Sequence, residues 1–203
     1  MKIFTRFGEF ILMLKGMFTK PENWRMYWKE LMHQCVELGI GSMGIVSIVA
    51  VFIGAVSTLQ TAYQFISPII PRSVIAQIVR DTVILEFAPT ITCVVLAGVV
   101  GSKISSELGN MRVSEQIDAL EIMGINTKAY LILPKILAAL ITIPLLVILA
   151  MTLGIWGGRF VGEVTGILPH EVFDRGLVEA FVPYNVKFAL VKAYTFAFII
   201  TAI

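Results

Sequence analysis

The chain has 203 residues, of which 57% are hydrophobic and only 15% are charged, and its mean hydropathy is +0.86. A soluble domain cannot bury this much apolar surface, so the composition indicates a membrane protein. The formal net charge of +2, without a basic run interleaved with aromatic residues, argues against a nucleic-acid partner.

The N-terminal segment, residues 1–34, predicts an amphipathic helix that lies along the membrane interface. Apolar residues recur there at helical spacing with charged residues between them: Phe4, Phe7, Phe10, Ile11 and Leu14. An ordinary soluble helix is the alternative interpretation. Trp24 and Trp28, which have basic neighbours, then resemble the aromatic belt that precedes entry into a membrane.

Four blocks of the chain are long and apolar enough to cross the roughly 30 Å of membrane hydrocarbon. The predicted spans are residues 36–62, 82–102, 130–158 and 186–203. Pro68 and Pro71 should end the first helix, and we expect a connection up to about Asp81 before the second. The sequence stops inside the fourth apolar block, from which we expect a fifth span in a continuation of the chain. The expected fold is one all-α membrane domain covering residues 1–203.

The distribution of basic residues predicts a cytoplasmic N-terminus, because cytoplasmic segments near span ends are enriched in Lys and Arg. Six basic residues precede the first span: Lys2, Arg6, Lys15, Lys20, Arg25 and Lys29. The segment after that span has Arg72 and Arg80. The same rule places the polar segment between the second and third spans in the cytoplasm.

That polar segment, residues 105–124, is the most informative part of the sequence. Ser114 is suited to cap a helix with Glu115 in its first turn, and Gly124 is suited to end it. An apolar face of this helix would carry Val113, Ile117, Leu120 and Gly124, and another face the acidic residues Glu115, Asp118 and Glu121. Such a helix could insert its apolar side into a soluble partner, while Arg112 and the carboxylates direct the contact.

The same segment resembles the cytoplasmic signature of MlaE-type permeases. That signature reads acidic, apolar, Gly, any residue, Met-Arg, then Glu-Gln and an apolar-rich helix that ends in Met. The positions matching the signature and its helix are Glu107, Gly109, Met111, Arg112, Glu115, Gln116, Asp118, Leu120, Glu121, Met123 and Gly124. The resemblance extends to Ala97-Gly98, Gly101-Ser102 and residues 154–158, and it implies that the segment couples the permease to an ATPase.

The resemblance implies further partners as well. A member of this family would be a homodimer in the bacterial inner membrane, bound to separate ABC ATPase subunits and to an MCE-domain lipid-binding protein on the other side. It would move phospholipid or a related lipid and so serve the lipid asymmetry of the outer membrane. ATP would bind to the partner subunit, so the permease itself would have no cofactor.

Glu86 and Pro89 are candidate residues of a lipid pathway. Many MlaE-type permeases have Arg-Glu-Leu-Gly-Pro where this chain has Leu85-Glu86-Phe87-Ala88-Pro89, so the usual basic neighbour is missing here. A carboxylate within a span must face a partner, a cavity or water. The alternative is that Glu86 lies at the level of the lipid headgroups. Lys192 is expected to extend to the outer interface.

The sequence carries no motif for enzymatic chemistry. The stretch from Gly98 to Lys103 lacks the spacing of a Walker A loop, so its small residues indicate helix packing. Two pairs, His33 with Cys35 and His170 with Glu171, lack the further ligands of a zinc site, so no metal site is expected. Cys35 and Cys93 fit small buried hydrophobes. A membrane scaffold and a proton-coupled secondary transporter using Glu86 are the alternatives to an ABC permease.

Overall fold

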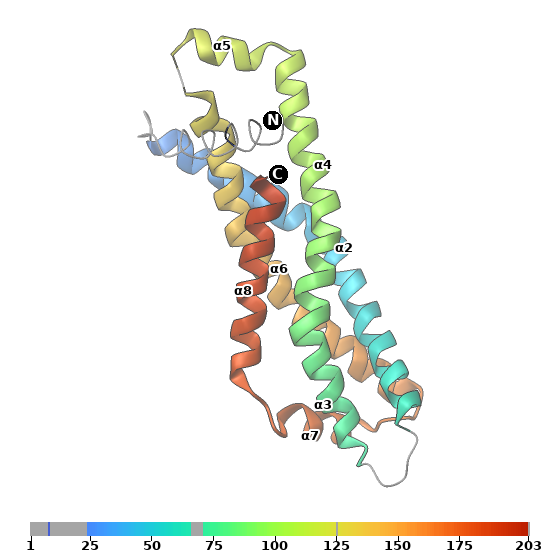
Figure 1. The fold of residues 1–203 in the computed structure, drawn as a ribbon. Coiled ribbons are helices and arrows are strands. Elements are labelled where there is room, and N and C mark those ends of the chain that lie inside the picture. Colours follow the sequence, from blue (N-terminus) through green and yellow to red (C-terminus); the bar gives the residue numbers. More distant parts are fainter. Residues whose placement is uncertain (1–7, 9–23, 66–70, 125, 203) are drawn as a thin grey trace.

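The computed structural model describes residue 8 and residues 24–65, 71–124 and 126–202 (Figure 1). Within this part of the chain there are helices and loops and no strand, which confirms the all-α prediction. The elements are α2 (Trp24–Gln64), α3 (Ser73–Thr82), η1 (Val83–Ile91), α4 (Thr92–Val113), α5 (Gln116–Ile122), α6 (Thr127–Val164), α7 (His170–Val178) and α8 (Pro183–Ala202). Of the predicted interfacial segment, residues 1–7 and 9–23 lie outside the described residues, and residues 24–34 form the start of α2.

Four helical stretches are long and apolar enough to cross a membrane, as the sequence predicts. They are Arg25–Gln64, Ser73–Val113, Ala129–Val164 and Pro183–Ala202. The first three are longer than the predicted spans. Because an α-helix rises about 1.5 Å per residue, helices of about 40 residues extend well beyond the hydrocarbon at one or both ends.

The predicted connection before the second span is a helix instead. Residues 73–82 form α3, which continues directly into η1 and α4. The helix is amphipathic: it buries Ile75, Ala76 and Val79 in a cluster with Phe173 of α7. The polar residues of this segment led to the prediction of a connection. Packing against α7 stabilises it as a helix instead.

Segments that are far apart in the sequence lie together at each end of the helical bundle (Figure 1). The first residues of α2 lie toward the same end as α5, whereas α7 and the start of α3 lie at the opposite end. The pair α2 and α6 has the most extensive contact, and α8 packs on α6, η1 and α4. The main core contains fully buried Leu96, Ile143 and Val147.

Glycines allow α2 and α6 to touch through their main chains. A Cβ added at Gly54 would overlap the carbonyl group of Gly154, and one added at Gly157 would overlap the main chain of Val51. Small residues permit such close approach of helices in membranes, where dispersion contacts drive packing. The glycines of residues 154–158 therefore have a packing role.

At the end of the bundle opposite α5, the Arg80 side chain binds the C-terminal end of α7. The Arg80 side chain is almost fully buried, and its Nη1 donates to the carbonyl oxygens of Gly176, Leu177 and Glu179 at 3.3, 2.8 and 2.9 Å. The carbonyl groups at the end of a helix lack intrahelical donors, so this guanidinium caps the end of α7. The salt bridge from Nε to Asp81, at 2.9 Å, completes its pairing.

Candidate functional site

The predicted coupling segment contains two helices rather than one. Helix α4 continues through the polar residues to Val113, and Ser114 is its C-cap, with Oγ donating to the Asn110 carbonyl at 2.7 Å. The prediction that Ser114 caps the next helix was therefore wrong. Glu115 occupies that position, in the left-handed region with φ 56°. Helix α4 continues without a break through the polar residues, so the chain turns only at Ser114 and Glu115.

The predicted end of this helix is correct. Gly124 has φ 78°, a conformation that favours glycine, and its amide donates to the Glu121 carbonyl at 3.0 Å. Helix α5 therefore spans only Gln116–Ile122 and lies across the gap between the end of α4 and the start of α6 (Figure 1). Asn126 begins α6, because its Oδ1 accepts from the amide of Ala129 at 3.3 Å.

The predicted apolar face of α5 is divided between two environments. Ile117 lies in an open groove of about 400 Å³ between α4, α5 and α6, whose lining residues are Leu108, Gly109, Arg112, Ile117, Thr127, Leu131 and Ile132. Val113 belongs to α4 and is 87% exposed, and Ile122 and Met123 are 87% and 65% exposed. Exposed apolar side chains therefore flank α5 at both ends, and Ile122 was not singled out in the sequence.

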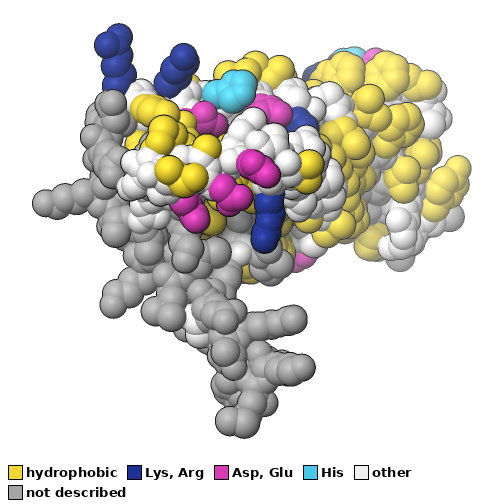
Figure 2. Space-filling view, turned by 90° about the horizontal axis from the view of Figure 1, so that it is seen from above, with side chains coloured by type: hydrophobic (Ala, Val, Ile, Leu, Met, Phe, Trp, Pro, Cys, Tyr) yellow, Lys and Arg dark blue, Asp and Glu magenta, His cyan; other side chains and the backbone are white. Residues whose placement is uncertain are grey.

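Most of the predicted coupling residues are on the surface. Exposed are Gly109, Arg112, Glu115, Gln116, Asp118, Glu121, Met123 and Gly124, and half-buried are Glu107, Met111 and Leu120. Figure 2 views this end from above and shows acidic and basic side chains among hydrophobic ones. The acidic residues of α5 and the exposed apolar side chains together form a surface suited to a partner protein.

Glu107 differs from the other predicted coupling residues because it points into the bundle. Its carboxylate forms a short ion pair with Nζ of Lys135 and accepts from Nε2 of Gln34 at 3.3 and 3.4 Å. Lys135 is 3% exposed and Gln34 is 1% exposed. We call Gln34, Glu107 and Lys135 the polar clamp, since they join α2, α4 and α6. Nothing in a single sequence indicates these pairings, because the three residues lie far apart along the chain.

Glu86 has a partner at the opposite end of the bundle. Nζ of Lys192, on α8, lies 3.0 Å from Oε1 of Glu86 and donates to the carbonyl oxygen of Leu85 at 3.0 Å. The ammonium also lies over the ring of Phe188, 5.1 Å from its centroid. Lys192 therefore pairs with Glu86 and Leu85, contacts that the sequence did not predict, and its extension to the interface stays a prediction.

Pro89 lies four residues after Leu85, whose carbonyl oxygen accepts from Lys192. Proline has no amide hydrogen, so the carbonyl of Leu85 cannot accept the usual α-helical bond from residue 89. The helix widens here into the π-helix η1, which contains Pro89, and Lys192 supplies a donor to Leu85. Glu86 and Pro89, both predicted as candidates, thus belong to one local arrangement completed by Lys192.

The two ion pairs lie about one hydrocarbon thickness apart. At about 1.5 Å per residue, the helical path from Glu86 to Glu107 is roughly 30 Å long. This spacing matches the alternative interpretation that Glu86 lies near the lipid headgroups. A carboxylate at each membrane boundary needs far less desolvation than one at the bilayer centre.

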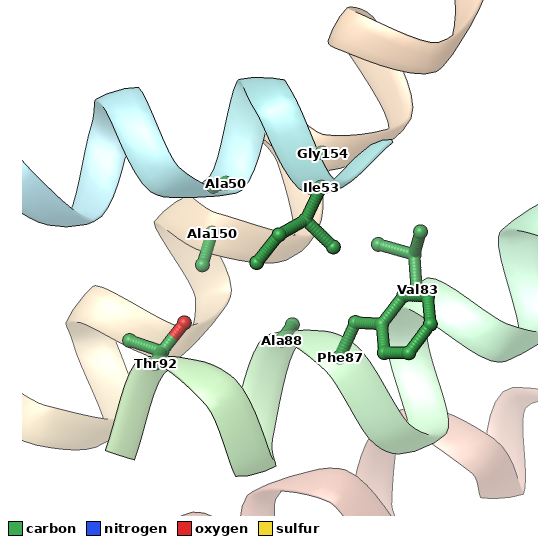
Figure 3. A pocket seen from close by; sticks show the side chains of 8 residues that line it. All are labelled: Ala50, Ile53, Val83, Phe87, Ala88, Thr92, Ala150 and Gly154. Atoms are coloured by element: carbon green, nitrogen blue, oxygen red, sulfur yellow. The ribbon is translucent and has the colours of Figure 1, made fainter. Parts of the chain in front are cut away.

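A cavity inside the bundle lies next to η1. Figure 3 shows Ala50 and Ile53 of α2 facing Phe87 and Ala88 of η1 across it, and its volume is about 10 Å³. The other lining residues are Val83, Thr92, Ala150 and Gly154. This volume accepts about one water molecule, so the cavity is too small for a lipid headgroup.

The cysteines and histidines form no evident metal site in the part of the chain that the structure describes. No group of three or more His, Cys, Asp or Glu side chains there could hold a metal ion. Cys35 and Cys93 are both free, and Cys93 is buried in the main core.

Known proteins resemble this chain over most of its length. It is 33% identical over 196 residues to a probable ABC transporter permease of Rickettsia bellii, covering 97% of this chain and 75% of the relative. It is 32% identical over 159 residues to the intermembrane phospholipid transport system permease MlaE of Haemophilus influenzae, covering 78% of this chain and 60% of that protein. The family described as Permease MlaE matches residues 31–203. The chain therefore belongs to the MlaE permease family.

Proposed function

We propose that this chain is the membrane permease of an ABC transporter that moves phospholipid or a related lipid, driven by a separate ATPase. The observation that carries the proposal is α5, which lies across the ends of two spans and exposes acidic and apolar side chains together. Membership of the MlaE permease family, and the name of the Haemophilus relative as a phospholipid transport permease, support the lipid substrate. The permease would be a non-enzymatic subunit that binds no ATP.

The partner ATPase would contact α5 and its flanks. Ile122 and Met123 are apolar side chains that a soluble groove could cover, and burial of such side chains supplies affinity. Glu115 and Asp118 are exposed, so basic residues of the ATPase would give the contact its direction. The end of the bundle that carries α5 would then be cytoplasmic, which agrees with the distribution of basic residues and with an inner-membrane location.

The Glu86–Lys192 pair would lie on the lipid pathway. Glu86 is exposed on the surface of this chain, although its carboxylate faces Lys192. A zwitterionic or anionic headgroup could exchange with this pair, because the ammonium would bind a phosphate while the carboxylate would bind an amine. Pro89 would contribute by leaving the Leu85 carbonyl available to hold Lys192.

Two further partners are part of the proposal. A second copy of this chain would pack on the exposed small residues of α4, among which Gly98 has nothing within 4 Å of an added Cβ. An MCE-domain lipid-binding protein would contact the end of the bundle that carries α7. The residues Val178 and Tyr184, 79% and 68% exposed, offer it an apolar surface there.

Co-purification of the permease with its partner ATPase tests the proposal. Glu115→Lys reverses a charge beside α5, whereas Glu171→Lys makes the same change on α7 at the opposite end and serves as the control. We expect Glu115→Lys to weaken ATPase binding by about tenfold or more, and Glu171→Lys to leave it unchanged. Lipid-stimulated ATP hydrolysis in nanodiscs should likewise fall in Glu115→Lys and stay unchanged in Glu171→Lys.

Other results would favour the alternatives. If the wild-type permease binds no ATPase, the transporter assignment is wrong and the chain is a scaffold. If ATPase activity is indifferent to Glu115→Lys, the coupling surface is misplaced. Lipid or solute transport that runs on a pH gradient without an ATPase would instead indicate a secondary transporter, and Glu86→Gln should then abolish it.

A further inference from the structure

The polar clamp holds a buried charge in a position that packing alone does not explain. The Lys135 side chain is 4% exposed, and its Nζ has the Glu107 carboxylate as its partner. A buried ammonium is strongly unfavourable unless it is paired and hydrogen-bonded. Gln34, also buried, donates to both oxygens of the same carboxylate and to Glu30 at 3.0 Å. The three side chains therefore depend on one another.

The polar clamp lies about two helical turns from α5 along both α4 and α6. Helix α5 is tethered at its first residue to the end of α4 and at its last residue to the start of α6. Glu107 lies about two turns before the end of α4, and Lys135 about two turns after the start of α6. The ion pair thus closes the path from α4 through α5 to α6, and Gln34 adds α2.

Whether α4 and α6 are joined to each other decides how a force applied to α5 moves them. If α4 and α6 were free to separate, a push on α5 would be absorbed by bending at the turns around Glu115 and Gly124, which both have positive φ. Because the Glu107–Lys135 pair joins α4 to α6 close to α5, the same force on α5 must move the two helices together. Packed side chains, ion pairs and rigid helices carry energetic coupling between distant sites.

We infer that Lys135 is a positioning residue that makes the α5 ends of α4 and α6 move as one unit, and that Gln34 extends this unit to α2. The inference rests on the proposed function, since an ATPase must act on α5. Lys135 touches neither the partner nor lipid in this role. It acts through Glu107, which the sequence predicted as one of the residues coupling the permease to an ATPase.

Lys103 provides a matched control for Lys135. It lies near the same end, but its Nζ donates to the main-chain oxygen of Glu37 at 3.0 Å and takes no part in the clamp. The variants are Lys135→Met, Lys103→Met, and the exchange of Glu107→Lys with Lys135→Glu. Each is made in the full-length permease bound to its ATPase in lipid vesicles, and the quantity measured is phospholipid transferred per ATP hydrolysed.

We expect Lys135→Met to retain the ATPase and its hydrolysis while transfer per ATP falls at least fivefold, the lower end of typical allosteric couplings. Lys103→Met should match the wild type, and the charge exchange should restore transfer. Unchanged transfer per ATP in Lys135→Met overturns the inference but leaves the proposed function intact. A wild-type permease that binds no ATPase overturns the proposed function instead.

A second measurement decides the case in which Lys135→Met does not fold. Spin labels at Asn110 of α4 and Leu137 of α6, both exposed, report the separation of the two helices in a background without Cys35 and Cys93. With Lys135 or the exchanged pair present, this distance should stay constant when the ATPase binds a non-hydrolysable ATP analogue. A distance that changes on nucleotide binding in the wild type contradicts the inference, because α4 and α6 would then not move as one unit.

Discussion

At the scale of single residues, Gly54 is the position with least tolerance for a side chain. An added Cβ would overlap the carbonyl group of Gly154, so a Gly54→Ala protein must separate α2 from α6 or distort one of them. We expect this change to destabilise the protein by about 1–3 kcal/mol, the usual effect of overpacking. Thermal unfolding in detergent measures the effect.

Gly44, on the same helix, is the control for this prediction. It has nothing within 4 Å of an added Cβ, so Gly44→Ala should leave the melting temperature unchanged or raise it slightly. Equal melting temperatures for the two variants would show that α2 and α6 are not in main-chain contact at Gly54.

Lys192 is a second residue whose effect can be predicted. Lys192→Met removes a side-chain donor to the Leu85 carbonyl, which cannot accept a bond from Pro89, and we expect a loss of about 1 kcal/mol in stability. Glu86→Gln should have a smaller effect, because the carboxylate is 61% exposed and exposed ion pairs contribute little.

Lys187→Met is the comparison for this residue. Lys187 is also on α8 and is exposed, so the loss of its charge should leave thermal stability unchanged. If Lys192→Met melts at the same temperature as Lys187→Met, the bond to Leu85 has no structural role.

At the scale of elements, α7 depends on one guanidinium. Arg80→Met leaves the carbonyl oxygens of Gly176, Leu177 and Glu179 without their donor. Because buried groups left without partners are costly, we expect local opening of α7 to become easier by roughly 2 kcal/mol, or about 30-fold. Trypsin cleavage after the exposed Arg175 should accelerate accordingly, while the four spans stay folded.

Arg72→Met separates this effect from a general loss of charge. Arg72 is exposed and makes a single bond, from Nη1 to the Ile167 carbonyl at 3.2 Å. Cleavage of this variant should stay close to the wild-type rate. Equal acceleration in both variants would mean that Arg80 does not cap α7.

Elements were predicted from sequence with uneven success, for physical reasons. The four spans follow from apolar length, which acts locally, and they were found. The helix α3 was missed because its amphipathic pattern needs α7 to bury Ile75 and Val79. The boundary at Ser114 was missed because a capping residue can serve the helix before it as well as the one after it.

At the scale of the whole molecule, the two ends of the bundle should lie on opposite sides of the membrane. Asn110 lies near α5 and Glu171 lies on α7, and both are exposed. With Cys35 and Cys93 replaced, a cysteine at position 110 should react with a membrane-impermeant maleimide only from the cytoplasm. A cysteine at position 171 should react only from the outside, and labelling of both from one side would refute the topology.

The candidate site shows a similar limit of sequence reasoning at this scale. Glu86, Pro89 and Glu107 were all singled out, because a carboxylate or a proline in an apolar or signature segment is conspicuous. Their pairing with Lys192 and Lys135 was not predicted, since these lysines come from other helices and only the packed bundle brings them near.

The roughly 30 Å between the Glu86–Lys192 and Glu107–Lys135 pairs has a consequence for the bilayer itself. A thicker bilayer would draw one pair into hydrocarbon, and a thinner one would leave apolar side chains between the pairs in contact with water. Each ångström of such hydrophobic mismatch costs a fraction of a kcal/mol, and the bilayer or the helix tilt must adjust. If the two pairs lie at the two boundaries of the hydrocarbon, the spacing of their carboxylates along one helix would match this protein to membranes of one thickness.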